Sequence, residues 1–524
     1  MKMKVYLKIL LGIVAFVVLI KLVTIVFVEP WIGKKIQVTL NEKFNDYIIE
    51  IHKVHISLFT SGIELENVTI GSKKEHGGLR DFNGEIVSIK LKGINLAKAL
   101  FNKEIHIGEV TVSESSINGK IPIPKKAGPP TLSTLNIRID SILFDKINMA
   151  VENTSDKKAF SVKEGVLKVY DLHVQKQDTL SPAIVGHFDF AAEELITVSS
   201  DSMYTIKATG IVCPATSNTL SVNSFSIHPN YKDYDFTARH KFESDRIEAL
   251  FTDILIHDFS SAGYFKSGNL ASTYIEIGNM DLKAFRDNRK MFQHVKKPAF
   301  QDMIYQYPGT LSIDSINLSG GNITYTEHAE KANEPGTISF NKINVKIYNI
   351  SNDTIYKTEK AYLQLNAEAL LMGKGRLTVL LRGRIFDNRN TFSVNGTLSG
   401  MDANELNPML EKNAFIFATS GKIDAMNFSF TANNTKSTGK MKLLYHGLDI
   451  TVKNKKTDET TAIKEQVSSI IANMIVLNAN PIPGEAMREG KIDYERDPER
   501  FLLNYCFKSI LSGIKSSITS NSKK

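Results

Sequence analysis

The sequence has few of the residues that usually mark chemistry, with two cysteines and one tryptophan in 524 residues. Cys213 and Cys506 are far apart and belong to no metal-binding or redox motif. We therefore expect two thiols in apolar surroundings, with a disulfide in an oxidising compartment as the alternative. Long runs of one charge are also missing, because the net charge is +8 but the longest basic tract is Lys453-Asn454-Lys455-Lys456. This pattern disfavours a nucleic-acid partner and favours an anionic membrane surface, although solvated lysine side chains explain it most simply.

Catalytic and metal-binding motifs are missing as well. His52 and His55 are three residues apart in an alternating segment, which would place them on opposite faces of a strand rather than on one metal ion. Gly421-Lys422 and Gly439-Lys440 lack the remaining residues of a phosphate-binding loop and predict turns. No GxSxG segment occurs. We predict a protein that is not an enzyme and needs no metal or cofactor, and an envelope hydrolase is the least favoured alternative.

One long apolar run, Ile9 to Val28, stands apart from this mixed composition. Its twenty residues suffice to cross roughly 30 Å of hydrocarbon as a helix, and only Lys21 and Thr24 interrupt it. The following Glu29-Pro30-Trp31-Ile32 offers no small-residue cleavage site, which favours a retained anchor over a cleaved signal peptide. The lysines between Lys2 and Lys8 favour a cytoplasmic N-terminus. We expect a single-pass protein whose bulk lies outside the cytoplasm.

The rest of the chain is dominated by period-two alternation of apolar and polar residues in short pieces, which predicts strands. The phase slips by one residue at recurring places, as between Leu65 and Val68 and between Ile107 and Val110. Since a one-residue insertion is a β-bulge, and bulges bend a sheet, we predict a mostly β fold: an elongated, curved, bulged sheet shaped like a trough, with few peripheral helices. The side chains expected to line its apolar inner face are those of Val54, Ile56, Leu58, Ile137, Ile139, Ile313, Leu377, Val379, Leu381, Phe428 and Phe430.

Two short segments recur along the chain in the same order. Ile139 to Ile142 returns as Ile313 to Ile316, and Lys168 to Leu172 returns as Lys346 to Ile350. A duplicated multi-strand unit explains both matches. Two composition shifts, at 120–130 and 268–308, interrupt the strand pattern. The predicted division is an anchor at 1–30, a first sheet segment with repeat copy 1 at 31–270, a mostly helical insert at 271–308, a second sheet segment with copy 2 at 309–460, and a helical tail at 461–524.

Four helices are expected after the anchor. They cover residues 32–44, Asp281 to Val295, Ile463 to Leu477, and a tail segment that begins with Asp497 as its N-cap. The tail helix carries an apolar stripe with lysines beside it. That stripe fits either direct membrane contact or packing on the end of the sheet, and packing is the favoured interpretation. Its residues are Phe507, Ile510, Leu511, Ile514 and Ile518.

Several of these segments together resemble a known family. The segments are Leu40 to Phe44, Ile49 to Phe59, Gly62 to Ile70, Gly375 to Leu381, Gly396 to Asp402, Leu406-Asn407-Pro408, Gly421 to Met426 and Gly439 to Met441. In their order behind an N-terminal span they resemble the AsmA-like proteins of Gram-negative envelopes, which are related in shape to TamB and to chorein-type conduits. The insert at 271–308 and the part of the tail from Asn480 to Lys524 depart from the family pattern.

The resemblance implies an inner-membrane protein with its bulk in the periplasm, which holds phospholipid-like molecules in an apolar β-groove between inner and outer membranes. An outer-membrane or periplasmic protein partner is a further expectation. The alternation supports this reading independently, because an apolar trough left open would be completed by acyl chains at roughly 0.8 kcal/mol per buried methylene. The alternative is a structural or assembly factor that guides outer-membrane proteins or envelope polymers by binding at its sheet edges.

Overall fold

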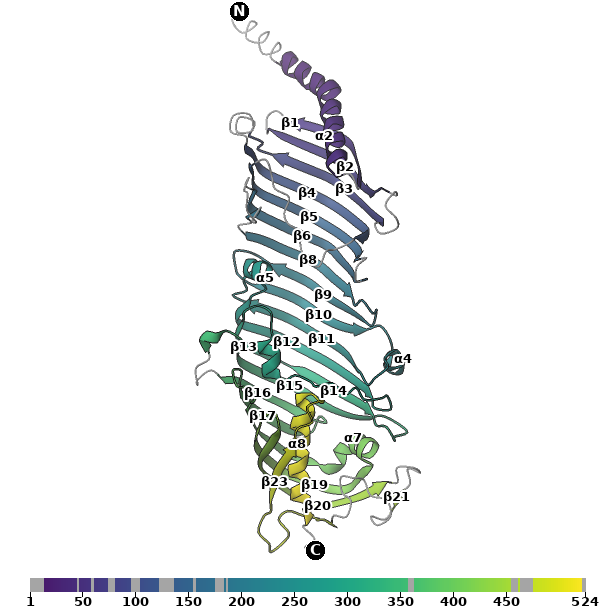
Figure 1. Ribbon diagram of the computed structural model, residues 1–524, viewed down its shortest axis with the longest axis vertical. Coiled ribbons are helices and arrows are strands. Elements are labelled where there is room, and N and C mark those ends of the chain that lie inside the picture. The colour runs from purple at the N-terminus through teal and green to yellow at the C-terminus, as the bar shows by residue number, and fades with distance from the viewer. Residues whose placement is uncertain are drawn as a thin grey trace, which may run out of the picture. The chain divides into compact units, whose positions relative to one another are not determined.

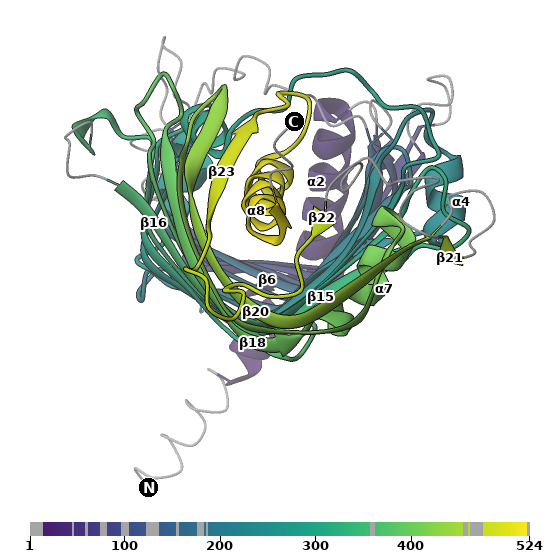
Figure 2. The same ribbon diagram turned by 90° about the horizontal axis from the view of Figure 1, so that it is seen from below.

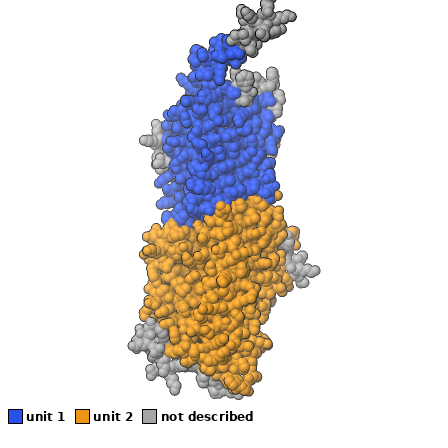
Figure 3. Space-filling view, turned by 180° about the vertical axis from the view of Figure 1, so that it is seen from behind, with its two compact units in different colours: residues 1–217 blue, residues 218–524 orange. Residues whose placement is uncertain are grey.

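The chain divides into two compact units, residues 1–217 and residues 218–524 (Figure 3). Both consist mainly of β-strands with few helices, which confirms the predicted fold class. The division falls at neither of the boundaries predicted for the sheet segments. The computed structural model describes residues 14–44, 47–57, 61–73, 81–95, 104–121, 136–153, 157–174, 183–184, 187–356, 362–453, 460–461 and 475–520.

A single long helix precedes the first strand (Figure 1). It spans Val14–Lys43 over 30 residues and is long and apolar enough to cross a membrane. Its described part begins within the predicted run, since residues 9–13 lie outside the described residues. A π-helical stretch, η1 (Thr24–Val28), leads into α2 (Glu29–Lys43), which confirms the helix expected at 32–44. Pro30 stands in the first turn of α2, where a backbone N–H would have no intrahelical acceptor.

The strands of unit 1 form one sheet in chain order, with β7 attached at the end of β6. All neighbours are antiparallel except β4 and β5, which run parallel. The strands are β1 (Tyr47–Ser57), β2 (Gly62–Ser72), β3 (Asp81–Lys92), β4 (Glu104–Ile121), β5 (Asn136–Asn153), β6 (Ala159–Val174), β7 (Ala183–Ile184), β8 (His187–Val198) and β9 (Tyr204–Cys213).

Two of the one-residue slips in the apolar–polar alternation of unit 1 are not β-bulges, which the sequence alone does not reveal. Asn67, between Leu65 and Val68, has a positive φ of 51°, and β1 pairs with β2 at an unbroken register on both sides of it. The pairing of β4 with β5 is likewise continuous past the slip at Gly108. These slips are therefore matched in neighbouring strands, so that no residue is left over. True register shifts of the bulge type occur where β5 pairs with β6, β15 with β16, and β19 with β20.

Unit 2 also contains a sheet in chain order, which curves around α8 (Figure 2). Its strands are β10 (Leu220–Pro229), β11 (Asp245–His257), β12 (Leu270–Asp287), β13 (Leu311–Ser319), β14 (Gly321–His328), β15 (Gly336–Ser351), β16 (Tyr362–Leu371), β17 (Gly375–Arg384), β18 (Phe392–Asp402), β19 (Ile416–Ala432), β20 (Lys436–Lys453), β21 (Thr460–Thr461) and β23 (Glu489–Glu495); β22 (Ile475–Val476) and β24 (Thr519–Ser520) pair separately. The helical elements are α4 (Asp233–Ala238), α5 (Ser261–Ser267), α6 (Phe300–Tyr305), η2 (Thr354–Tyr356), η3 (Ala403–Leu406), α7 (Asn407–Met409), η4 (Leu410–Ala414) and α8 (Leu502–Ile518).

The recurring sequence segments occupy equivalent places in the two units. Ile139 of β5 pairs with Leu172 of β6, and the matching Ile313 of β13 pairs with Ile350 of β15. In each unit the strand before the repeat runs parallel to it: β4 beside β5, and β12 beside β13 and β14. Parallel neighbours need a crossover. The two composition shifts at 120–130 and 268–308 thus overlap the two crossovers, of which the first lies largely outside the described residues.

The helix expected at Asp281 to Val295 is wrong, and so is the mostly helical insert at 271–308. β12 continues to Asp287, and only α6 is helical in the crossover. The spacing misled because both faces of β12 carry apolar side chains: Leu282 packs partly buried in the cluster around Met280 on one face, while Phe285 on the other is 4% exposed and meets the Tyr234 ring of α4 edge-on. Burial on both faces removes the period-two signal of a strand.

The predicted tail also needs correction. α8 begins at Leu502 rather than at Asp497, because residues 497–501 are tied to other parts of unit 2; the backbone N–H of Lys297, for instance, donates to the carbonyl oxygen of Pro498. Most of the helix expected at Ile463 to Leu477 lies outside the described residues, and Ile475 and Val476 form a strand. Nor is the tail helical throughout, since β23 extends the sheet beside β20.

Candidate functional site

The most unusual feature of unit 1 is an apolar face that continues across its whole sheet. Paired residues of adjacent strands project from the same face, so the pairing defines two rows of side chains. The Val54 row consists of Val54, Leu65, Ile89, Val112, Phe144, Leu167, Phe190 and Cys213. The Ile56 row consists of Ile56, Ile63, Leu91, Val110, Ile142, Val169 and Phe188. No polar residue interrupts either row.

Among the residues that the structure describes in unit 1, a helix covers only the first strands of this face. Ile32, Ile36 and Leu40 of α2 pack against a cluster centred on Ile49, Val54, Leu65 and Val68 of β1 and β2. From β4 to β9, no helix that the structure describes in unit 1 packs on the rows. Most of these side chains are therefore half-buried by their neighbours in the sheet rather than enclosed. A face of this kind lacks the second apolar layer that normally completes a core.

The opposite face of the same strands is polar and salt-bridged. The Lys92 ammonium lies 3.2 Å from a carboxylate oxygen of Glu109, and Lys163 lies 2.8 Å from Glu193. His106 Nε2 contacts the Asp140 carboxylate at 3.0 Å, and this hydrogen bond is the main cause that lowers the pKa of Asp140 below its ordinary value. Pairs of this kind on an exposed face contribute little stability. They mark this face as the one in contact with water.

Unit 2 repeats the pattern with longer rows. The Leu220 row consists of Leu220, Ile256, Ile275, Ile316, Ile347, Leu365, Leu381, Val394, Phe430, Gly439 and Ile492. The Val222 row consists of Val222, Ile254, Ile277, Leu318, Val345, Ala367, Val379, Gly396, Phe428, Met441 and Gly490. In the Val222 row the aromatic ring of Phe428 lies over its glycine partner Gly396.

In unit 2 the end of the apolar face is closed by α8, which lies on the concave side of the sheet (Figure 2). The helix and the strands β18, β19, β20 and β23 share the largest apolar cluster among the described residues, in which Phe430 is 2% and Ile492 0% exposed. The face of α8 that is most deeply buried carries Tyr505, Ser509, Gly513 and Ser517. This end of the sheet is consequently filled by the protein itself.

The predicted lining residues have different fates. Val54 and Ile56 lie under α2, Ile313 packs with Ile304 and Tyr307 near α6, and Phe428 and Phe430 lie in the cluster that α8 closes. Leu377, Val379 and Leu381 are partly buried against that same cluster. Ile137 pairs with Ile105 and Val174, and Ile139 with Ile107 and Leu172. These last two remain on strands that no described helix of unit 1 covers, and Leu58 lies outside the described residues.

The predicted stripe of α8 divides between its two sides. Ile510, Ile514 and Ile518 pack against the cluster, as the packing interpretation expects, whereas Phe507 is 51% exposed. Leu503, which the sequence analysis did not single out, is 84% exposed. Both cysteines are thiols, as expected, and burial raises the pKa of Cys506 to about 12.

Helix side chains also occupy the free edges of the two end strands, a role that sequence reasoning missed. The backbone N–H groups of β1 donate to α2: Ile49 to Asn41 Oδ1 at 2.8 Å, Ile51 to Gln37 Oε1 at 3.3 Å, and Ile56 to Glu29 Oε1 at 2.9 Å. The available signal was that Glu29, Gln37 and Asn41 are eight and four residues apart, which places them on one side of α2 beside its apolar stripe.

At β23 the corresponding groups are serines of α8. Lys491 N–H donates to Ser516 Oγ at 3.0 Å and Asp493 N–H to Ser512 Oγ at 3.1 Å. An uncovered strand edge is a template for pairing with another chain. Both edges are thus protected by hydrogen bonds from within their own unit.

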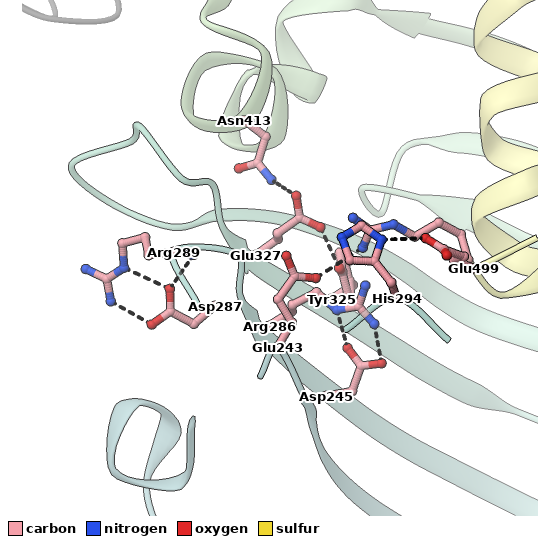
Figure 4. Close-up of polar contacts among 11 residues, drawn as sticks. Glu243, Asp245, Arg286, Asp287, Arg289, His294, Tyr325, Glu327, Asn413 and Glu499 are labelled. Atoms are coloured by element: carbon pink, nitrogen blue, oxygen red, sulfur yellow. Dashed lines mark hydrogen bonds and ion pairs between the residues drawn. The ribbon is translucent and has the colours of Figure 1, made fainter. Parts of the chain in front are cut away.

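Unit 2 also contains a cluster of hydrogen-bonded polar and charged side chains (Figure 4). Arg286 Nε and Nη2 donate to the two carboxylate oxygens of Asp245 at 2.6 and 2.5 Å, and Glu327 accepts from Tyr325 and Asn413. Burial alone would lower the pKa of Arg286, but Asp245 outweighs it and raises that pKa. Burial, reinforced by Glu327, raises the pKa of Tyr325.

Two side-chain contacts hold the segment that enters α8. Arg500 Nη1 lies 3.1 Å from Glu243 Oε2, and His294 Nδ1 lies 2.9 Å from Glu499 Oε2 (Figure 4). Because every carboxylate of this cluster already has a partner, the arrangement fixes the segment that enters α8 instead of presenting a free acid or base.

Among the described residues no group of three or more His, Cys, Asp or Glu side chains is placed to hold a metal ion. His52 and His55 make separate contacts, the former with the carbonyl oxygen of Asn67 and the latter with Glu29 and Glu66. Comparison with known proteins finds no matching family model and no matching curated protein. The resemblance to AsmA-like proteins therefore stays a prediction.

Proposed function

We propose that this protein is a membrane-anchored, non-enzymatic carrier that holds phospholipid-like molecules by their acyl chains on the apolar face of its sheet. The observation that carries the proposal is the Val54 and Ile56 rows of unit 1, which stay apolar through β9 and β8 respectively, although among the described helices of unit 1 α2 covers only their first strands. An acyl chain laid on these rows would provide the missing apolar layer. Its burial would stabilise the complex by roughly 0.8 kcal/mol per buried methylene.

The anchor and compartment belong to the same proposal. The helix Val14–Lys43 is long and apolar enough to hold the protein in an inner membrane. With the N-terminus in the cytoplasm, the sheets of both units would lie in the periplasm, where lipid must pass between two bilayers. The salt-bridged face would meet water, and the polar headgroups would remain at the margin of the apolar face.

A charge placed on the uncovered rows tests the proposal. Phe144 belongs to the Val54 row, whereas its neighbour Leu143 pairs with Thr111 and Lys168 on the polar face. Phe144→Asp should remove bound lipid, because a carboxylate on the apolar face would have to be desolvated. Leu143→Asp is the matched control and should retain lipid. Native mass spectrometry of the detergent-extracted proteins measures the lipid, and circular dichroism checks the fold. Equal lipid in a folded Phe144→Asp variant would contradict the proposal.

The alternative is an assembly factor that guides envelope proteins by pairing strands at its sheet edges. The edges of β1 and β23 speak against it, since side chains of α2 and α8 already bind their N–H groups. Photocrosslinking from position 144 separates the two, because adducts with acyl chains support the carrier and adducts with protein strands alone support the alternative.

A further inference from the structure

A pocket of about 860 Å³ lies on the polar face of unit 2, opposite to the Leu220 row. Its floor follows one row of paired residues, Tyr348, Gln364, Arg382, Ser393 and Thr431, and the turn between β17 and β18 closes one side. An acyl chain on the apolar face could not reach this pocket through the sheet. A different ligand must be considered for it.

Arg382 is the residue that gives the pocket its chemistry. Its Nε donates to Gln364 Oε1 at 2.9 Å, which orients the guanidinium, and no carboxylate that the structure describes forms an ion pair with it. Other arginines of unit 2 are differently placed: Arg286, Arg376 and Arg500 each bind a carboxylate. A guanidinium held by a neutral amide keeps its two terminal nitrogens for an anion, in the fork geometry that suits phosphate and carboxylate.

A second arginine strengthens the positive charge. Arg384 Nε and Nη2 donate to the hydroxyl of Tyr362 at 3.1 and 2.7 Å, and its guanidinium lies 5.2 Å from the centre of that ring. Among the described residues of the lining Asp387 is the one acidic residue, and its carboxylate accepts hydrogen bonds from the backbone N–H groups of Arg389 and Thr391. The described lining therefore carries more positive than negative charge, and the carboxylate of Asp387 is engaged in the turn.

The remaining lining indicates a ligand larger than an inorganic anion. Hydroxyl and amide groups of Asn349, Thr391, Ser393 and Thr431 surround the arginines, together with the rings of Tyr348 and Tyr362. Such groups bind hydroxyls, and aromatic faces accept the C–H surface of a polyol. We propose that this pocket binds a hydroxylated phosphate ester, and that Arg382 is the main hydrogen-bond donor to its phosphate group. Glycerol phosphate and sugar phosphates share this chemistry, whether free in solution or as a lipid headgroup.

Equilibrium binding to the full-length protein in detergent tests the proposal, with glycerol 3-phosphate, inorganic phosphate and glycerol as probes. Glycerol 3-phosphate should bind saturably and more tightly than phosphate, and glycerol should not bind. Arg382→Ala should weaken glycerol 3-phosphate at least about tenfold, since it removes charged hydrogen bonds. Arg376→Ala is the matched control, because Arg376 lies on the same strand and the same face but is bound to Glu368 outside the pocket. This control should leave affinity unchanged.

Vesicles of phosphatidylglycerol distinguish the source of the ligand. Binding of both the soluble ester and vesicles, each weakened by Arg382→Ala and not by Arg376→Ala, assigns a headgroup; binding of the soluble ester alone assigns a free metabolite. Equal loss in the two variants, or no saturable binding of any phosphate ester, overturns the proposal. None of these outcomes depends on lipid held at the apolar rows, which Phe144→Asp reports separately.

Discussion

The helices α2 of unit 1 and α8 of unit 2 have the same two structural roles but fulfil them with different side chains. Each helix covers apolar rows of a sheet, and each satisfies the N–H groups on the free edge of an end strand. α2 reaches its strand with long polar side chains, such as Asn41, which both donates to and accepts from Ile49. α8 uses serine hydroxyls, which reach only when helix and strand lie close together.

Two glycines make the close approach at α8 possible. A Cβ at Gly490 of β23 would lie 2.6 Å from the backbone oxygen of Gly513, and one at Gly513 would lie 2.7 Å from Ile492 Cγ1. At the α2 end a Cβ at Gly33 would meet only the Val54 side chain, 2.8 Å away. The position of α8 is therefore fixed by the close approach of its backbone to that of β23, whereas α2 is held by side chains that can adjust.

The largest expected effect concerns the thiol of Cys506 in α8. Burial raises its pKa to about 12, so at pH 8 its thiolate fraction should be about a thousandfold below that of an unperturbed cysteine. In a Cys213→Ser background, Cys506 should react with a thiol reagent about a thousandfold more slowly in the folded protein than in urea. Rapid labelling of the folded protein would show that α8 leaves the sheet, and the contrast with α2 would fail.

Substitutions of Gly490 and Gly33 compare how closely α8 and α2 pack on their strands. Gly490→Ala forces a methyl group against backbone atoms and should destabilise the docking of α8 by about 3 kcal/mol. Gly33→Ala should cost less than about 1 kcal/mol, because Val54 can shift and alanine favours the helix. Hydrogen exchange of the amides in α8 and α2 measures both. Gly71→Ala serves as the control, since a Cβ there meets nothing within 4 Å. Equal effects at Gly490 and Gly33 would remove the distinction.

The edge hydrogen bonds give a smaller difference. Asn41→Ala removes two bonds to Ile49 and should cost about 2 kcal/mol, whereas Ser512→Ala removes one bond to Asp493 and should cost about 1 kcal/mol. Exchange rates of the Ile49 and Asp493 amides report these losses residue by residue. Ser512→Thr keeps the hydroxyl and should restore protection; if it behaves like the alanine variant, the hydroxyl is not what protects the edge.

The sequence predicted the apolar faces better than what covers them. Alternation alone indicated residues such as Ile139 and Phe430, since period two is a property of the strand itself. Whether a helix then packs on a given row depends on contacts between distant segments, as between Phe430 and α8. The apolar stripe of the tail drew attention to Phe507, but the side that packs most closely carries Ser509 and Gly513, because small residues allow the approach.

The parallel neighbours were equally hidden. A strand reads the same in sequence whether its partner runs parallel or antiparallel, and only the interruptions at 120–130 and 268–308 hinted at a crossover. β12 is the example: Phe285 and Leu282 lie on opposite faces that both carry apolar side chains, and their spacing imitated that of a helix.

The smallest expected effect is a pH dependence at the α8 end. Hydrogen bonds from Lys436 and then Lys491 lower the pKa of Asp493, whose backbone N–H is the one bound by Ser512. A carboxyl group whose pKa is lower in the folded state stabilises that state above its ordinary pKa, and this contribution disappears as the pH falls through the lowered value. Protection of the β23 amides against hydrogen exchange, corrected for the intrinsic rate, should therefore weaken when the pH falls below the ordinary carboxyl pKa range.

The Asp493→Asn variant should flatten that part of the pH profile of protection, because an amide side chain does not titrate. Since Asp493 is partly exposed, the effect should also shrink with added salt. An unchanged profile in Asp493→Asn would mean that serine hydroxyls and glycine contacts alone hold this edge, which would make the contrast with α2 one of packing and not of charge.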